Sequence, residues 1–194
     1  MPWETKFDIT ESIDKATYLF WSKGYKATSL ADLLTAMEIN KGSFYNTFGS
    51  KKALFTQSLK RYKQLHPGKI FSEAQKIDNP IESINYLFDR IVEQSINDLD
   101  KKGCLIINTA IDLPHHDPDI NLTVKKTING INLFFEQQIE KGVSLNLINK
   151  DIDVQAVAKS LLSFAVSIRV LSRGVLSEHE LQQLKSQALK QING

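Results

Sequence analysis

Residues 29–55 read SLADLLTAMEINKGSFYNTFGSKKALF, and this stretch decides the predicted fold. Ser29 can cap a short helix with an apolar face, and the chain breaks at Glu38. Asn40 can cap a second short helix, which Gly49 ends. Two short helices joined by a tight turn form the layout of a helix-turn-helix, whose second helix enters the DNA major groove. The stretch therefore predicts a reading helix that begins directly after Asn40.

The rest of the chain is also helical by pattern. Apolar side chains recur at three- and four-residue spacing, and strand-like alternation is nearly absent. The predicted helices lie near residues 9–23, 30–37, 41–48, 51–66, 80–96, 104–113, 118–141, 154–173 and 178–192. The sequence therefore predicts an all-α protein.

The break at His66-Pro67-Gly68 predicts a domain boundary. It separates a three-helix helix-turn-helix domain, residues 1–50, and its connecting helix, residues 51–66, from a second helical domain, residues 67–194.

Composition is that of a globular protein, with 42% hydrophobic and 24% charged residues among 194. No stretch approaches the roughly 18 consecutive apolar residues that span a bilayer, and the first residues lack a signal-peptide pattern. The one cysteine, Cys104, excludes an intramolecular disulfide and suits a reducing compartment. We therefore expect a cytoplasmic protein that binds no membrane.

Basic residues gather in the first third of the chain. Residues 1–66 hold ten Lys and Arg against six Asp and Glu, whereas residues 67–194 hold fourteen against sixteen. Residues 39–63 contain six basic residues and no acidic one. A basic surface without acids is typical of a face that binds phosphates.

Each part of the helix-turn-helix suggests a DNA contact. A helix N-terminus offers free N–H groups to phosphate, and small or amide side chains on the reading helix can reach base edges. Phe44 and Phe48 are expected to anchor the reading helix to its own domain. The predicted DNA-binding residues are Thr28, Ser29, Lys41, Gly42, Ser43, Tyr45, Asn46, Thr47 and Lys51. Caps, glycines and lysines occur in any small helical protein, so a helical protein without DNA binding stays an alternative on these grounds.

Residues 9–55 resemble the N-terminal domain of the tetracycline-repressor (TetR) family. The matching segments are ITESIDKATYLFWSKGYKATSLADLL, residues 9–34, and KGSFYNTFGSKKALF, residues 41–55. The turn departs from the family pattern, because Glu38 stands where a glycine is usual. A non-glycine residue in a left-handed backbone there costs about 1 kcal/mol.

The resemblance implies a homodimer whose two reading helices enter successive major grooves of a palindromic operator, roughly 34 Å apart. It implies a repressor that a small molecule releases from DNA. It further implies that Thr28, Tyr45 and Lys51 contact phosphates, and that Lys41, Gly42, Ser43, Asn46 and Thr47 face base edges.

No nucleophile–base set and no phosphate-cradling glycine loop is visible, so a small helical enzyme is the weaker alternative, and no cofactor is expected. His115-His116-Asp117 makes a poor metal site, because adjacent ligands in a loop lack further partners. Asp117 is expected to cap the next helix instead.

The C-terminal helices 154–173 and 178–192 are predicted to pair with their copies in a dimer, or else to close the core of one protomer. The predicted interface residues are Leu161, Ile168, Leu181, Leu184 and Ala188. An effector pocket is expected among the helices that start near residues 80, 104, 118 and 154. Its candidate lining residues are Phe88, Cys104, Ile107, Asn108, Ile111, Phe134, Phe135 and Phe164.

Cys104 supports a second hypothesis. A similar Gly-Cys-Leu segment is found in one branch of the family, some of whose members sense electrophiles or oxidants through cysteine. The alternative function is thus a repressor triggered at Cys104, which requires a reactive thiolate. The simpler alternative is a small buried side chain.

Overall fold

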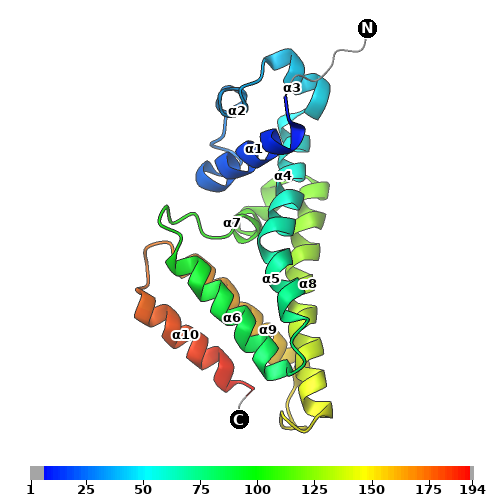
Figure 1. The fold of residues 1–194 in the computed structure, drawn as a ribbon, viewed down its shortest axis with the longest axis vertical. Helices are drawn as coiled ribbons and strands as arrows, with labels where there is room; N and C mark the ends of the chain where they lie inside the picture. Colours follow the sequence, from blue (N-terminus) through cyan, green and yellow to red (C-terminus); the bar gives the residue numbers. More distant parts are fainter. Residues whose placement is uncertain (1–6, 193–194) are drawn as a thin grey trace.

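The structure, a computed structural model, describes residues 7–192 (Figure 1). Within this range the chain forms ten α-helices and one 3-10 helix and no β-strand, which confirms the all-α prediction. The helices are α1 Ile9–Lys23, α2 Leu30–Met37, α3 Lys41–Phe48, α4 Lys51–Leu65, α5 Pro67–Ala74, α6 Pro80–Ile96, α7 Leu105–Ile111, η1 Leu113–His115, α8 Pro118–Ser144, α9 Val154–Leu171 and α10 Glu178–Lys190.

Helix caps place the N-terminal helices where the sequence predicted them. The Asp8 carboxylate accepts the Thr10 N–H at 2.7 Å, and the Asn40 side chain accepts the Ser43 N–H at 2.8 Å. Glu38 has φ 57° and ψ 38°, so the turn between α2 and α3 takes the left-handed conformation expected for it. α1 packs against α2 and α4, and α1–α3 lie together at the top of Figure 1.

The connection after α4 holds a helix that the sequence analysis did not predict. His66 ends α4 with φ −109° and ψ −85°, and Pro67 directly begins α5. Proline is tolerated in a first helical turn because its missing N–H would have no partner there. Gly68 is needed at this kink, since a Cβ would lie 2.7 Å from the Lys63 carbonyl oxygen.

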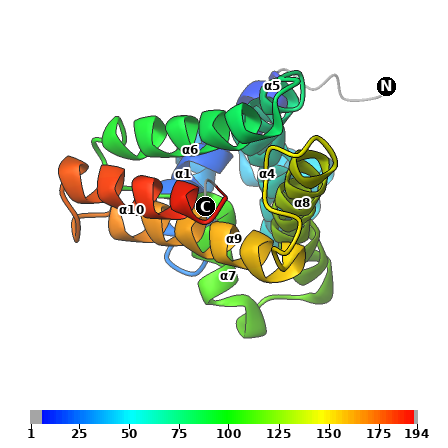
Figure 2. The ribbon, with the colours of Figure 1, turned by 90° about the horizontal axis from the view of Figure 1, so that it is seen from below.

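Two apolar cores hold the molecule together. One core joins α5, α6, α9, α10 and the C-terminal half of α8. The other joins α1–α4 with Leu105 and Ile106 of α7 and with Ile120 and Val124 of α8. Seen from below, α6, α10 and α9 are stacked beside one another, and α8 lies at their edge (Figure 2). Helices α1–α4 therefore share their core with elements of the second half of the chain.

By length and composition alone, α9 could cross a membrane, since it has 18 residues of mean hydropathy 1.5. The segment is not a run of consecutive apolar residues, because Gln155, Lys159 and Arg169 interrupt it, so the finding does not contradict the expectation from the sequence. In the structure, α9 packs against α6, α8 and α10, 28% of the segment is buried, and one of its buried residues is Arg169.

Candidate nucleic-acid interface and effector cavity

The reading helix α3 is fixed by its aromatic side. Phe44 is fully buried and Phe48 nearly so, as predicted, and their ring centroids lie 5.8 Å apart. Both pack into the core formed with α1 and α4. This anchorage turns the opposite side of α3 to solvent.

The solvent side of α3 carries the predicted base-edge residues. Lys41, Gly42, Tyr45 and Asn46 are exposed, whereas Ser43 and Thr47 are half-buried. None of these side chains makes a hydrogen bond or ion pair with another residue in the range 7–192. Their polar atoms are therefore available for hydrogen bonds to DNA.

The N-terminus of α2 differs from its prediction. Thr28 is fully buried, and its hydroxyl donates to the Gly24 carbonyl oxygen at 2.7 Å, so this hydroxyl is not available to a phosphate. The Ser29 hydroxyl donates to the Asp32 carboxylate at 2.8 Å. The Ser29 backbone N–H, the Ser29 hydroxyl and Lys23 together lower the pKa of Asp32 to about 2. A negative charge thus occupies the helix end that was expected to attract phosphate.

Basic residues near α3 divide into two groups. The Lys51 ammonium lies over the Tyr25 ring, 4.5 Å from its centroid, and burial lowers its pKa. Lys52 pairs with Asp117 at 3.2 Å, and Lys26 pairs with Asp112 at 2.8 Å. The last two lysines join the DNA-binding helices to the second half of the chain. Lys41 and Lys51, in contrast, form no ion pair within residues 7–192, and they are the basic side chains in or next to α3 that are left to bind DNA.

The histidine segment after α7 packs against the DNA-binding helices. His116 is buried, 5.4 Å from the Tyr25 ring and 5.8 Å from the Phe55 ring between centroids, and burial lowers its pKa. His115 contacts the Asp112 carboxylate at 2.7 Å. Asp117 stands at the N-cap position of α8, as predicted. Among residues 7–192 no group of three side chains could hold a metal ion.

A cavity of about 60 Å³ lies among α4, α5, α6, α7, α8 and α9. Most of its walls are aliphatic or aromatic, and five side chains bring polar atoms. These five residues are Tyr62, Gln94, Cys104, Thr127 and Arg169.

Only Cys104 and Ile107 of the predicted pocket residues line this cavity. Phe88, Phe134 and Phe135 fill the core, Phe164 packs against that core, and Ile111 is 68% exposed. Asn108 lies in a separate surface cleft and donates to the Lys102 carbonyl oxygen at 2.7 Å. Large aromatic side chains fill space rather than leave it, which is why the aromatic signal did not find the cavity. A lone arginine within the apolar segment 160–172 was the missed signal.

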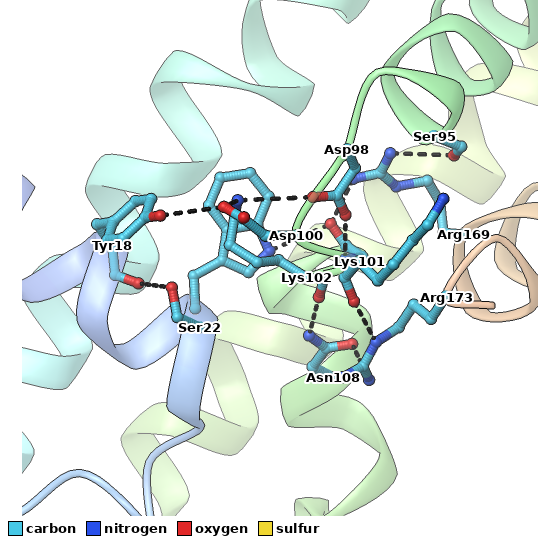
Figure 3. A network of polar contacts seen from close by, with 12 residues as sticks. Tyr18, Ser22, Ser95, Asp98, Asp100, Lys101, Lys102, Asn108, Arg169 and Arg173 are labelled. Carbon is cyan, nitrogen blue, oxygen red and sulfur yellow. Dashed lines mark hydrogen bonds and ion pairs between the residues drawn. The ribbon is translucent and has the colours of Figure 1, made fainter.

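Residues 98–103, between α6 and α7, connect the cavity to α1 (Figure 3). The Gly103 carbonyl oxygen accepts the Arg169 guanidinium at 2.5 Å and the Trp21 indole N–H at 3.1 Å. The Tyr18 hydroxyl donates to Asp100, and Asp100 pairs with Lys102. Gly103 has φ 70°, and a Cβ there would lie 2.7 Å from Arg173 Cδ, so glycine is required. We call residues 98–103 the connecting loop.

Four of the five predicted dimer residues do not face outward. Leu161, Ile168, Leu181 and Ala188 are buried within the protomer, and a side chain that is already covered cannot contact a second copy, so the prediction is wrong for these four. Leu184 is half-buried against the core, and its place in an interface stays a prediction. The outer side of α9 carries small residues instead, exposed or half-buried: Ala156, Ser160, Ser163, Ser167 and Val170.

Two family models match this chain. Residues 13–57 match the N-terminal model of "bacterial regulatory proteins, tetR family". Residues 80–186 match the "Tetracyclin repressor-like, C-terminal domain" model. The chain belongs to the TetR family. Members of this family are DNA-binding transcriptional regulators, and this chain is a regulator of that kind.

Relatives of similar length support the assignment to the TetR family. The chain is 27% identical to the transcriptional repressor ComR of Escherichia coli over 95% of this chain and 88% of ComR. It is 26% identical to the regulator YezE of Bacillus subtilis over 91% of this chain and 92% of YezE.

Solved TetR-family structures share the fold. One is a cysteine-substituted CifR bound to a 26-base-pair operator, with TM-score 0.84, 23% identity, and coverage of 95% of this chain and 97% of CifR. Another is reduced NemR of E. coli, with TM-score 0.80, 21% identity and the same coverage.

Proposed function

We propose that this TetR-family regulator is a cytoplasmic homodimeric repressor that binds a palindromic operator and is released by a small molecule in the cavity among α4–α9. The free outer side of α3 carries this proposal. It combines an exposed cation, exposed hydroxyl and amide groups, and buried aromatic anchors on the opposite side.

Lys41, Gly42, Ser43, Asn46 and Thr47 are proposed to face base edges, and Tyr45 and Lys51 to bind phosphates. Ser29 is left out of the proposed phosphate contacts, because its backbone N–H and its hydroxyl both donate to the Asp32 carboxylate. Arginine, lysine, amide and hydroxyl groups are the side chains that read base edges and grip phosphates.

The test uses fluorescence anisotropy with a labelled duplex from the promoter beside the protein's own gene, across a range of salt concentrations. The chain is expected to bind, and its affinity should fall as salt rises, because each neutralised phosphate releases a counterion. Lys41→Ala should weaken binding and reduce the salt slope by about 1. Lys63→Ala, an exposed lysine at the far end of α4, is the matched control and should change neither. Absence of binding at low salt would rule out the proposal.

A second candidate function is release triggered at Cys104, and one observation favours it: the half-buried thiol lines the cavity. The sulfur of the thiolate would add to one carbon of the C=C double bond of the electrophile, whose π bond breaks, and the other carbon would take up a proton from solvent in place of the proton that the thiol lost. Cys104→Ser should then keep operator binding and lose its release by an electrophile such as N-ethylmaleimide. Unchanged release in this variant would eliminate the second candidate.

A further inference from the structure

Arg169 is a buried charge without a counter-ion. Its side chain is 7% exposed. Within residues 7–192 it forms no ion pair, and its hydrogen bonds go to two neutral acceptors, the Ser95 hydroxyl at 3.1 Å and the Gly103 carbonyl oxygen at 2.5 Å. A guanidinium has five N–H donors, so further donors remain. Burying a cation without an anionic partner is costly, and such a site favours an anion.

No ionisable group within residues 7–192 forms an ion pair with Arg169, and the two carboxylates that line a surface cleft with it, Asp98 and Asp100, pair with Lys102 instead. Burial raises the pKa of Tyr62 well above its usual value, so its hydroxyl stays neutral. Burial and the charge of Arg169 lower the pKa of His66, so its imidazole is neutral too. The buried Asp98 carboxylate is directed elsewhere, since it accepts the Gly103 N–H at 2.6 Å and pairs with Lys102.

The mostly apolar residues that line the cavity with Arg169 indicate that the rest of the ligand is apolar. Ile91, Ile131, Leu162 and Val166 line the same cavity, are partly buried, and offer aliphatic surface to a small molecule. Gln94 also lines the cavity and makes no side-chain hydrogen bond with another residue of the range 7–192, so its amide is a further polar group for a ligand. One cation in the wall of a mostly apolar cavity fits a molecule with one anionic group and a short apolar body.

We propose that the cavity binds a small organic carboxylate, with its oxygens accepting hydrogen bonds from Arg169 and its apolar part among α6, α8 and α9. This inference rests on the proposed function, since it names the chemical class of the effector. Carboxylate and guanidinium form short, charge-assisted hydrogen bonds, often in pairs.

The hydrogen bond between Arg169 and Gly103 also links ligand binding in the cavity to the DNA-binding helices. Arg169 and Trp21 of α1 donate to one carbonyl oxygen, that of Gly103. A carboxylate that draws the guanidinium away from this oxygen changes what holds the connecting loop against α1. Trp21 is therefore a built-in reporter of ligand binding.

The test measures thermal stability and Trp21 emission during titration with straight-chain carboxylates from propanoate to octanoate, each against its neutral amide. A Trp3→Phe background leaves Trp21 as the one tryptophan. Carboxylates should raise the melting temperature and change the emission. The amides should bind about ten- to hundredfold more weakly, the range expected for losing hydrogen bonds to a charged group.

Two variants separate charge from space. Arg169→Gln should abolish the preference for carboxylate over amide. Because Arg169 also supports the connecting loop, Ile131→Phe provides a second variant that fills the cavity and keeps the charge, and it should abolish binding of both ligands. Equal binding of carboxylate and amide by the parent protein, or a preference that survives Arg169→Gln, would overturn the inference.

The binding assay contains no DNA, so the two proposals fail separately. Operator binding without carboxylate binding would overturn the inference and leave the repressor proposal standing. Carboxylate binding without operator binding would overturn the repressor proposal and leave carboxylate binding by the cavity standing.

Discussion

The reading helix α3 and the cavity around Arg169 both present positive charge, but they hold it in opposite ways. Lys41 is exposed to water, so holding its charge costs little, and such a charge attracts any phosphate in a salt-dependent way. Arg169 is buried, and within residues 7–192 its hydrogen bonds go to two neutral acceptors and it forms no ion pair. An exposed cation therefore contributes affinity for DNA in general, whereas a buried one selects a particular small anion.

The largest expected effect separates the two sides of α3. Phe44→Ala should lower the free energy of unfolding by about 3–5 kcal/mol, because it empties a fully buried aromatic site. Tyr45→Ala, at the adjacent exposed position, should leave stability nearly unchanged and weaken operator binding. Urea unfolding followed by circular dichroism, together with operator anisotropy, measures both. Equal loss of stability in the two variants would contradict the division of α3 into an anchor side and a reading side.

A substitution on α9, far from α3 in sequence, should weaken DNA binding although it changes neither Lys41 nor Arg169. Ser163→Arg places a large cation on the outer side of α9, where we propose that two protomers meet. Operator affinity should fall by roughly a hundredfold, since a single protomer loses the second half-site. Sedimentation velocity reports the oligomeric state, and Asn129→Arg on the exposed side of α8 is the matched control. A dimeric Ser163→Arg protein would show that the interface lies elsewhere.

The packing of His116 against Tyr25 and Phe55, which joins the second half of the chain to α1–α4, should weaken in mild acid. Burial lowers the pKa of His116 below its usual 6.5, so protonation favours the unfolded chain, and stability present above pH 6.5 is lost as pH falls through the folded-state pKa. His66 shifts in the same direction and adds to the effect. Urea unfolding from about pH 7.5 to about pH 5.5 measures the slope. His116→Leu should reduce that slope, whereas a change at exposed His179 should not.

The smallest expected effect lies at the turn before α3. Glu38→Gly should raise the free energy of unfolding by about 0.5 kcal/mol, because relief of the left-handed backbone exceeds the loss of an exposed ion pair with Lys15. Glu38→Gln removes the ion pair and keeps the backbone cost, so it is the control. A Gly variant no more stable than the Gln variant would contradict the strain at this turn.

Local features of the sequence predicted local structure well. Ser29 and Asn40 cap the helices they were expected to cap, and Glu38 takes the left-handed conformation expected at the turn. These signals act through hydrogen bonds within three residues, so they are readable without a fold. The same Pro-Gly pair that suggested a boundary also hid α5, because proline both interrupts helices and begins them.

Features assembled from distant segments were not readable. The cavity takes walls from six helices, and burial decided against Phe88 as a liner and against Leu161 as an interface residue. An apolar residue at helical spacing looks the same whether it faces its own core or a second protomer. The predicted phosphate contact of the Thr28 hydroxyl was wrong for a related reason, since this hydroxyl donates to the backbone carbonyl oxygen of Gly24, four residues earlier.

The core shared by α1–α4, α7 and the start of α8 sets a rule for building chimeric regulators. A fusion cut at His66, where the chain kinks, would strip Leu105, Ile106, Ile120 and Val124 of the partners they pack against. Such a hybrid would begin with an exposed apolar surface and a connecting loop without its tryptophan contact. New operator specificity is better introduced by exchanging only the outer residues of α3, which leaves every buried side chain in place.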